Sequence, residues 1–192
     1  MAKGVLLIIS GPSGSGKGTI VEQLVSELGY CVSISATTRN PRPNEKDGIH
    51  YFFKTKEEFE KMIDNGELLE HAAFCGNYYG TPKKYVEEQL ESGKNIILEI
   101  EVQGALQVKK KYNDAVLIFT MPPTLTELRR RLEFRGTETK EVIDARINRA
   151  EEELEFLPDY DYIVINDTVD EAVKDVDCIV KAERMKCSRN PE

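Results

Sequence analysis

A glycine-rich stretch near the start of the chain has the composition and spacing of a phosphate-binding loop. Residues 11–19 read GPSGSGKGT, which fits the pattern G-x-x-x-x-G-K. Glycines let the backbone turn tightly and point successive N–H groups inward, and a helix that follows presents its positive end to the same point. Lys17 adds a charge for the β and γ phosphates of a nucleoside triphosphate. The loop therefore predicts a nucleotide-phosphate site made by Gly11, Pro12, Ser13, Gly14, Ser15, Gly16, Lys17, Gly18 and Thr19.

The loop departs from its usual pattern at one position. Gly18 stands where serine or threonine commonly follows the lysine, and the hydroxyl group comes one residue later, at Thr19. One residue along a helix rotates a side chain by about 100°, so Thr19 does not automatically replace the missing magnesium ligand. Because Mg²⁺ keeps several water ligands readily, we expect the ion to be held largely through water.

A second set of residues has the chemistry to hold another phosphate. Arg39 and Arg42 are three residues apart in the segment SATTRNPR, on a loop held by proline. Guanidinium forks match a phosphate dianion, and Tyr51, Tyr78 and Tyr79 add hydroxyl groups. The alternative interpretation is a pair of solvated loop arginines. A GTPase would normally carry the motif N-K-x-D, which the sequence lacks, so these residues favour an acceptor site.

Strand and helix signals alternate along the chain, which predicts an α/β fold with a mostly parallel central sheet flanked by helices. The first strand, over 4–10, is apolar at consecutive positions, as expected when both faces of a strand are buried. The helix after it, over 17–28, has apolar residues at helical spacing. Further strands are expected at 95–100, 115–120 and 161–166, each followed by a helix.

Local signals mark where several helices begin. Threonine followed three residues later by glutamate, the capping-box pattern, occurs at Thr55, Thr124 and Thr168. The pair Thr81-Pro82 predicts another helix with proline at its first position, and Gly93 would end that helix.

Two stretches interrupt the alternation. Residues 31–80 contain short β-like segments, a proline-bearing loop and one helix, which predicts an inserted α+β subdomain. Residues 135–145 are polar and separate two charged helices, which predicts a mobile lid. We therefore expect one domain with a core (about 1–32, 82–134 and 147–186), a monophosphate-binding insertion (about 33–81), a lid (about 135–146) and a frayed tail (187–192).

Composition argues against several classes of protein. The 192 residues carry 34 acidic and 26 basic side chains, for a net charge of −8, so we expect no nucleic-acid partner. The apolar run Val5–Ile9 is far shorter than the roughly 20 residues that span a bilayer, and no charged leader precedes it. Four cysteines without metal-ligand spacing are expected as reduced thiols of a cytoplasmic protein that does not contact membranes. Monomer and oligomer are both left open.

Several longer segments together resemble the guanylate kinases. In chain order these segments are GPSGSGKGT, SATTRNPR, DGIHYFF, ELLEHAAFCGNYYGTP, ILEIEVQGA, RRRLEFRGTET and VIND, and they extend over about residues 7–167. The resemblance implies a P-loop nucleoside monophosphate kinase of purine metabolism, with ATP, GMP and Mg²⁺ as its ligands. Its reaction would convert ATP and GMP reversibly to ADP and GDP, with dGMP as a further acceptor.

The resemblance also implies which residues hold the acceptor. The phosphate of GMP would contact Arg39, Arg42, Tyr51 and Tyr79, and the guanine base would contact Ser35, Glu70, Thr81 and Glu101. Glu70, as a carboxylate, can accept from both N1–H and the 2-amino group of guanine, which adenine cannot offer, and a hydroxyl group can donate to O6. A site of matched buried polar groups can reject an analogue that lacks the partner groups by about 10⁴-fold. Many relatives have aspartate where this chain has Glu101.

On the ATP side, the resemblance places Arg131, Arg135 and Arg146 against the ATP and transferring phosphates, Glu99 near hydrated magnesium, and Asn166 at the adenine edge. Glu99 and Glu101 are two residues apart in a strand pattern, so we expect both on one face. They need not form a general acid and base pair, because the attacking phosphate oxygen is already anionic. The neighbouring Arg129, Arg130 and Arg149 are expected to be surface charges.

Two other functions fit parts of the sequence. Guanylate-kinase-like domains of scaffold proteins bind phosphopeptides without catalysis, but the intact Gly16-Lys17 pair and the arginine-bearing lid favour an enzyme. A kinase of similar form could instead act on another phosphorylated small molecule, such as a sugar phosphate. The combination of Glu70, Ser35 and Thr81 favours guanine.

Overall fold

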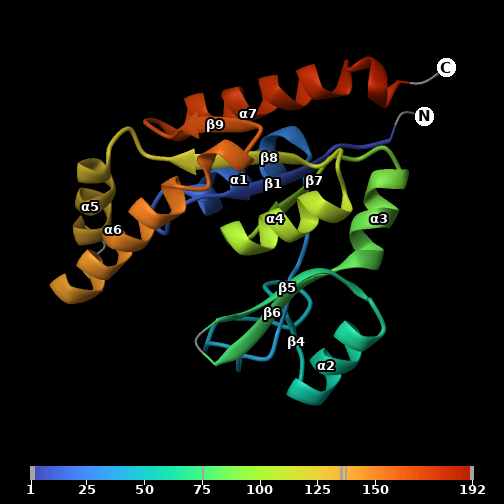
Figure 1. Cartoon of the computed structure of the whole chain (residues 1–192), viewed down its shortest axis with the longest axis horizontal. Helices are drawn as coiled ribbons and strands as arrows, with labels where there is room; N and C mark the ends of the chain where they lie inside the picture. Colours follow the sequence, from blue (N-terminus) through green and yellow to red (C-terminus); the bar gives the residue numbers. More distant parts are fainter. Residues whose placement is uncertain (1–2, 75, 135, 137, 191–192) are drawn as a thin grey trace.

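The computed structural model describes residues 3–74, 76–134, 136 and 138–190, and it has two separate β-sheets with helices around them (Figure 1). The larger sheet has five strands in the order β2-β7-β1-β8-β9, and every neighbouring pair is parallel, which confirms the predicted α/β fold. Its strands are β1 (Leu6–Ser10), β2 (Cys31–Val32), β7 (Ile96–Glu99), β8 (Val116–Met121) and β9 (Tyr162–Ile165).

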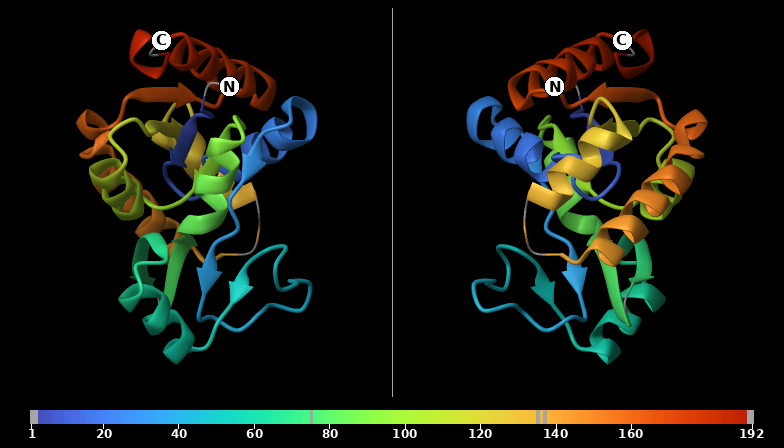
Figure 2. Two further views of the ribbon diagram at one scale, coloured as in Figure 1. Left: turned by 90° about the vertical axis from the view of Figure 1, so that its right-hand side faces the viewer. Right: turned by 90° about the vertical axis from the view of Figure 1, so that its left-hand side faces the viewer.

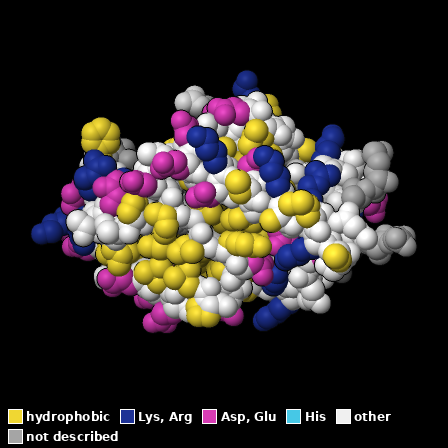
Figure 3. Space-filling view, turned by 90° about the horizontal axis from the view of Figure 1, so that it is seen from above, with side chains coloured by type: hydrophobic (Ala, Val, Ile, Leu, Met, Phe, Trp, Pro, Cys, Tyr) yellow, Lys and Arg dark blue, Asp and Glu magenta, His cyan; other side chains and the backbone are white. Residues whose placement is uncertain are grey.

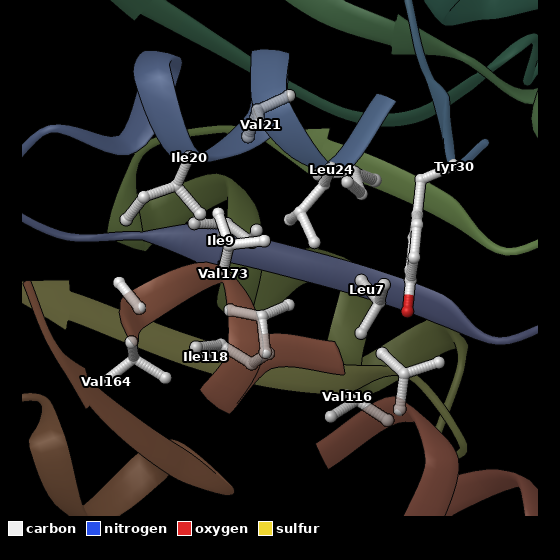
Figure 4. Close-up of a cluster of buried hydrophobic side chains, with 14 of the residues drawn as sticks. Leu7, Ile9, Ile20, Val21, Leu24, Tyr30, Val116, Ile118, Val164 and Val173 are labelled. Carbon is white, nitrogen blue, oxygen red and sulfur yellow. The ribbon is translucent and has the colours of Figure 1, made fainter. Parts of the chain in front are cut away.

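Helices cover both faces of this sheet, which explains why its central strands are apolar at most positions, on both faces. On one face lie α1 (Lys17–Leu28) and α7 (Val169–Arg184), and on the other lie α3 (Lys83–Glu91) and α4 (Val102–Lys111). Figure 4 shows the first of these layers, where Ile9 of β1, Ile20 of α1 and Val173 of α7 point toward one another. The carboxyl ends of the strands are thereby held rigidly at one edge of the sheet.

A pair of helices stands beyond that edge (Figure 1). Helix α5 (Leu125–Phe134) and helix α6 (Lys140–Leu154) pack on each other through a small core of their own. That core contains Leu128, Leu132, Ile143, Ile147 and Ala150. The pair therefore forms a compact unit that carries charged side chains next to the ends of β1 and β8.

The second sheet is built from residues that lie between β2 and α3 in the sequence, on the far side of α4 from α7 (Figures 1 and 2). Its order is β4-β3-β6-β5, and α2 packs on it through Phe59, which is fully buried. The elements are β3 (Ala36–Thr37), β4 (Phe52–Phe53), α2 (Lys56–Asp64), β5 (Leu68–Phe74) and β6 (Asn77–Pro82). β2, by contrast, belongs to the larger sheet.

The predicted helix caps differ in how complete they are. At α2, Thr55 Oγ1 accepts from the backbone N–H of Glu58 over 3.1 Å, and the Glu58 carboxylate accepts from the Thr55 N–H over 2.8 Å, which is a full capping box. At Thr124 and Thr168 the hydroxyl oxygen accepts from the backbone three residues on, over 3.0 and 3.4 Å. The Glu127 carboxylate accepts instead from two arginines of its own helix, so the cap at α5 differs from a full box.

One expectation about element bounds was wrong, and two further segments can be described in more detail. Pro82 is not the first residue of α3 but ends β6, because it pairs with Leu68 and the next residue, Lys83, donates its N–H to Glu67 O. Helix α6 begins at Lys140, so the second part of the expected lid loop is helical. Residues 187–189, expected to be frayed, form a 3₁₀ turn, η2 (Cys187–Arg189), whose arginine contacts Glu183.

One face of the molecule carries charged side chains of both signs (Figure 3). Figure 3 shows lysine and arginine side chains scattered among aspartate and glutamate on the face seen from above. In the described part of the chain, no helix is both long and apolar enough to cross a bilayer. The described cysteines Cys31, Cys178 and Cys187 form no disulfide, and Cys75 lies outside the described residues.

Candidate active site

The phosphate loop connects β1 directly to α1, as the sequence predicts. Gly16 caps α1 in the left-handed conformation, with φ of 89°, and Gly11 has φ of 136°. A Cβ atom at Gly11 would lie 2.0 Å from Thr120 O, and one at Gly16 would lie 2.2 Å from Asn166 Nδ2. The loop is therefore packed so closely on β8 and on Asn166 that only glycine fits at these two positions.

The side chain of Lys17 is tied to the same loop. Its Nζ donates to Gly11 O over 2.5 Å and to Pro12 O over 3.1 Å. These contacts fold the lysine back over the turn that carries Gly11 and Pro12. The ammonium group is thus held against the phosphate loop itself.

Lys17 also lines a cavity of about 400 Å³ that opens between the two sheets. The cavity brings together side chains from distant parts of the sequence, including most of the predicted acceptor residues. Its walls are formed by Lys17, Ser35, Tyr51, Glu70, Ala72, Tyr79, Gly80, Glu99, Ile100, Glu101 and Gly104. A phosphate-loop lysine and most of the predicted acceptor residues therefore line one cavity.

Glu70 is the buried carboxylate of this cavity. Its side chain lies on β5 and is 4% exposed, and its Oε1 accepts a hydrogen bond of 2.7 Å from the hydroxyl of Thr81 on β6. Burial raises the pKa of Glu70, and the hydrogen bond from Thr81 opposes that rise. Thr81 is fully buried and does not line the cavity itself, so it acts on Glu70 rather than facing the space.

One glycine makes room for Glu70 and was missed by the sequence analysis. A Cβ atom at Gly104 of α4 would lie 2.8 Å from Glu70 Oε2. Glycine is unfavourable inside a helix, so its presence there is a signal that something approaches the backbone closely. Here the approaching group is the carboxylate.

Arg39 lies at the tyrosine side of the cavity. Its guanidinium makes a two-pronged ion pair with Glu45, at 2.9 Å on each side, and stands 5.4 Å from the centre of the Tyr51 ring. Hydrogen bonds from Arg39 and from the backbone N–H of Arg42 lower the pKa of Glu45 to about 2. Arg42 itself is exposed and does not line the cavity, so the structure does not bring its side chain to the other predicted phosphate ligands.

Glu99 and Glu101 line the cavity together, although only Glu99 belongs to a strand. β7 ends at Glu99, and Glu101 is the N-cap of α4, so the expected strand alternation does not extend to Glu101. Glu99 faces the phosphate loop: a Cβ atom at Gly18 would lie 3.9 Å from its Oε1. Partial removal of the carboxylate from water raises the pKa of Glu99, and the positive charge of Lys17 opposes this rise.

The arginines of the helix pair reach the loop to different extents. Arg146 of α6 donates to Ser13 Oγ over 2.5 Å and to Glu138 over 2.5 Å. Arg131 of α5 donates to Glu127 over 2.7 Å and to Asp167 O over 3.3 Å. Arg135 lies outside the described residues. Arg146 therefore already touches the phosphate loop, whereas Arg131 is held against the segment after β9.

Asn166 forms a hydrogen bond with the backbone of the phosphate loop. Its side chain is 2% exposed, and its Nδ2 donates to Ser15 O over 2.7 Å. It also forms part of a second cavity of about 390 Å³ between the loop, α5 and the start of α7. That cavity is lined by Gly14, Gly16, Arg130, Arg131, Phe134, Asn166, Asp167 and Val169.

Comparison with known proteins identifies relatives over almost the whole chain. A family model described as guanylate kinase matches residues 3–183. Proteins named guanylate kinase from Desulfitobacterium hafniense (strain Y51) and Halalkalibacterium halodurans are 50% and 54% identical to the chain. Those alignments cover 98% and 97% of this chain, and 94% and 92% of the relatives. The crystal structure of guanylate kinase from Anaplasma phagocytophilum is similar over 98% of this chain and 90% of that chain, with 35% identity and a TM-score of 0.77.

Proposed function

This chain belongs to the guanylate kinase family, and we propose that the cavity between its two sheets is where GMP meets the γ-phosphoryl group of ATP. The protein is an ATP:GMP phosphotransferase, a nucleoside monophosphate kinase. The observation that supports the placement of the reaction is that Lys17 of the phosphate loop and Glu70 of the second sheet line one cavity. With the ATP phosphates held at Lys17 and the guanine base held at Glu70, the two nucleotides would meet in this cavity.

Glu70 is the residue that distinguishes guanine in this proposal. Its carboxylate accepts from N1–H and from the 2-amino group, while Thr81 fixes one of its oxygens and Gly104 leaves room for the other. Ser35 donates to O6, and Glu101 accepts from the second hydrogen of the 2-amino group. Adenine has no hydrogen at N1 and no 2-amino group, so it would offer the buried Glu70 carboxylate no donor to replace water, which carries a large free-energy cost.

The phosphate of GMP is assigned to Arg39, Tyr51 and Tyr79. Glu45 already orients the guanidinium over the Tyr51 ring, so Arg39 needs little reordering to form charge-assisted hydrogen bonds. Arg42 joins this set when the exposed loop that carries it moves toward the cavity. The ordering of that loop on GMP binding is part of the proposal.

The transfer itself needs positioning and charge compensation rather than a base. An oxygen of the GMP phosphate attacks the γ-phosphorus of ATP, a new P–O bond forms, and the bond to the β–γ bridging oxygen breaks to release ADP. Lys17, Arg131, Arg135 and Arg146 compensate the charge on the transferring group, with the lid (about 135–146) closing over it. Closure excludes water, which would otherwise accept the phosphoryl group.

Mg²⁺ fits the donor set near the loop. Glu99 supplies one carboxylate facing the position of Gly18, and the described residues contain no group of three or more His, Cys, Asp or Glu side chains that could hold a metal by themselves. That is the arrangement expected for an ion bound mainly by nucleotide phosphates and water, with Glu99 as an outer contact. The ion would neutralise charge on the β and γ phosphates.

The test is ADP formation from Mg-ATP with GMP, dGMP, AMP, CMP, UMP or no acceptor in parallel. Turnover is expected with GMP and dGMP only. Glu70→Gln should raise KM for GMP while ATP binding is retained, and Glu67→Gln, the same change at an exposed position three residues earlier, should alter neither. ATP binding without turnover on any acceptor would favour a binding module, and equal losses of ATP and GMP binding in Glu70→Gln would remove the base assignment.

A further inference from the structure

Arg149 of α6 joins two carboxylates that belong to different parts of the molecule. Its Nη2 lies 3.2 Å from Glu101 Oε2, at the N-cap of α4, and its Nε lies 3.2 Å from Glu153 Oε1, one turn further along α6. The sequence analysis expected Arg149 to be a surface charge, and its side chain is indeed 51% exposed. Its partners, however, include one residue of the acceptor cavity.

Glu153 restricts the position of the Arg149 side chain through their ion pair. Glu153 is 8% exposed, and its Oε2 is buried without a hydrogen-bond partner among the described residues. It lies at the floor of a cavity of about 510 Å³ between α6 and the phosphate loop, whose walls include Pro12, Ser13 and Glu101. A buried carboxylate needs a compensating charge, and the guanidinium of Arg149, 3.2 Å away, supplies it.

Glu101, in contrast, has little support from its own element. Its side chain is 67% exposed, and it has three rotatable bonds before the carboxylate. A side chain of this kind must be ordered before it can accept a hydrogen bond from a base, and the ordering reduces affinity. The contact with Arg149 uses Oε2 and leaves Oε1 available to the cavity.

We infer that Arg149 is a positioning residue that holds Glu101 ready for the 2-amino group of guanine. This inference rests on the proposed function, because it requires Glu101 to contact the base. The support runs from Glu153 through Arg149 to Glu101. Since Arg149 and Arg146 lie on the same helix, the arrangement also links recognition of the base to the helix whose Arg146 touches the phosphate loop.

The consequence is selective for one chemical group. GMP and inosine monophosphate share the phosphate, the ribose, N1–H and O6, and differ in the 2-amino group. Loss of Arg149 should therefore weaken the binding of GMP by about five- to tenfold, the size expected for one side chain that is no longer ordered. The binding of inosine monophosphate should be weakened much less. A general loosening of α6 would weaken both acceptors alike.

The experiment measures kcat and KM for GMP and for inosine monophosphate with Mg-ATP saturating. Arg149→Ala should raise KM for GMP, with a smaller change in kcat, and should reduce the preference for GMP over inosine monophosphate. Arg149→Lys, which keeps one charge but not the two-sided contact, should give an intermediate preference. Glu153→Gln should largely keep the preference, because an amide oxygen still accepts from Arg149 Nε.

Removing Arg149 leaves the charge of Glu153 buried, so a folding defect must be separated from the effect on Glu101. The double variant Arg149→Ala, Glu153→Gln removes that charge and should show the same loss of preference as Arg149→Ala. Arg129→Ala, which breaks another arginine ion pair between α5 and α6, at 2.5 Å with Asp144, should leave the preference unchanged. An unchanged preference in both Arg149 variants overturns the inference.

Variants of Glu101 distinguish this inference from the proposed function. Glu101→Ala should itself reduce the preference for GMP, and adding Arg149→Ala should then have no further effect. If Glu101→Ala leaves the preference intact, the assignment of Glu101 to the base is wrong. If Glu101→Ala lowers the preference and Arg149→Ala does not, the role of Arg149 alone is wrong.

Discussion

The hydroxyl of Thr81 donates to Oε1 of Glu70 over 2.7 Å, and both side chains are almost completely removed from solvent. An amide oxygen could accept that hydrogen bond as well as a carboxylate oxygen can. What the carboxylate adds is a charge, and burial of that charge raises the pKa of Glu70. Burying the charge of Glu70 therefore costs free energy when no ligand is bound. A ligand that donates two hydrogen bonds to the carboxylate can offset this cost.

Glu70→Gln should consequently stabilise the ligand-free protein at neutral pH. Because the folded-state pKa is raised, the native chain binds more protons than the unfolded chain between the ordinary glutamate pKa and the raised one, so wild-type stability falls as pH increases through that window. The free energy of unfolding from urea denaturation at several pH values should converge for wild type and variant below about pH 4. A variant less stable than wild type at pH 8 would contradict this account.

Gly104→Ala should damage acceptor binding without affecting ATP. The added Cβ would lie 2.8 Å from Glu70 Oε2, and overpacking of this kind costs about 1–3 kcal/mol. We expect KM for GMP to rise about tenfold or more, while KM for ATP stays within about twofold of wild type. Steady-state kinetics with each substrate varied in turn would test this, and equal changes in both KM values would count against it.

Asn166 should matter for the loop as well as for the nucleotide. Asn166→Ala leaves Ser15 O without its donor, which should cost about 1–3 kcal/mol in the free energy of unfolding. Asn166→Asp should be worse, because it places a second acceptor against that carbonyl oxygen. Denaturation curves and KM for ATP are the measurements, and an aspartate variant as stable as wild type would exclude the stated role of the Nδ2–H group.

Gly18 can be converted to the residue type common at its position. A Cβ atom there meets Glu99 Oε1 at an ordinary distance of 3.9 Å, so Gly18→Ser and Gly18→Ala should both fold and gain about 0.5–1 kcal/mol from helix propensity. Only the serine variant adds a hydroxyl ligand, so it alone should need less Mg²⁺ for half-maximal activity. Identical magnesium titrations for the two variants would show that the hydroxyl does not reach the ion.

Lys17→Ala should lower kcat rather than acceptor affinity. The ammonium group lies over the loop turn and acts on charge that develops during transfer, so its loss should reduce kcat by about 100-fold or more. KM for GMP should change much less. Rapid-quench measurement of a single turnover would show whether the chemical step is the one affected, and a defect confined to GMP affinity would contradict the role.

Much of the larger sheet could be predicted because its strands are buried on both sides. β1 and β8 each begin with four consecutive apolar residues, and their positions follow from that pattern. The second sheet was harder, since β3 and β4 have two residues each and exist only through pairing with strands distant in sequence. The same tertiary pairing overrode the local helix signal at Pro82.

The candidate site divides in a similar way. The phosphate loop is local in sequence, so its position follows from nine consecutive residues. The contacts of Arg149 and Gly104 depend on how α6 and α4 pack against other elements. No sequence motif around either residue predicts these contacts. The identity of the acceptor rested on resemblance, because Glu70 alone reads as an ordinary exposed carboxylate.

The chain leaves the larger sheet after β2 and returns through α3 to β7, and β2 and β7 are hydrogen-bonded neighbours. The whole second sheet is thus inserted at one place and alters no strand order in the larger sheet. The segment between β2 and α3 could therefore be exchanged as a unit, by evolution or by design. The same phosphoryl-transfer residues would then act on a different acceptor. Compatibility would be decided where the inserted segment contacts the larger sheet and its helices, above all at the tight fit of Gly104 on Glu70.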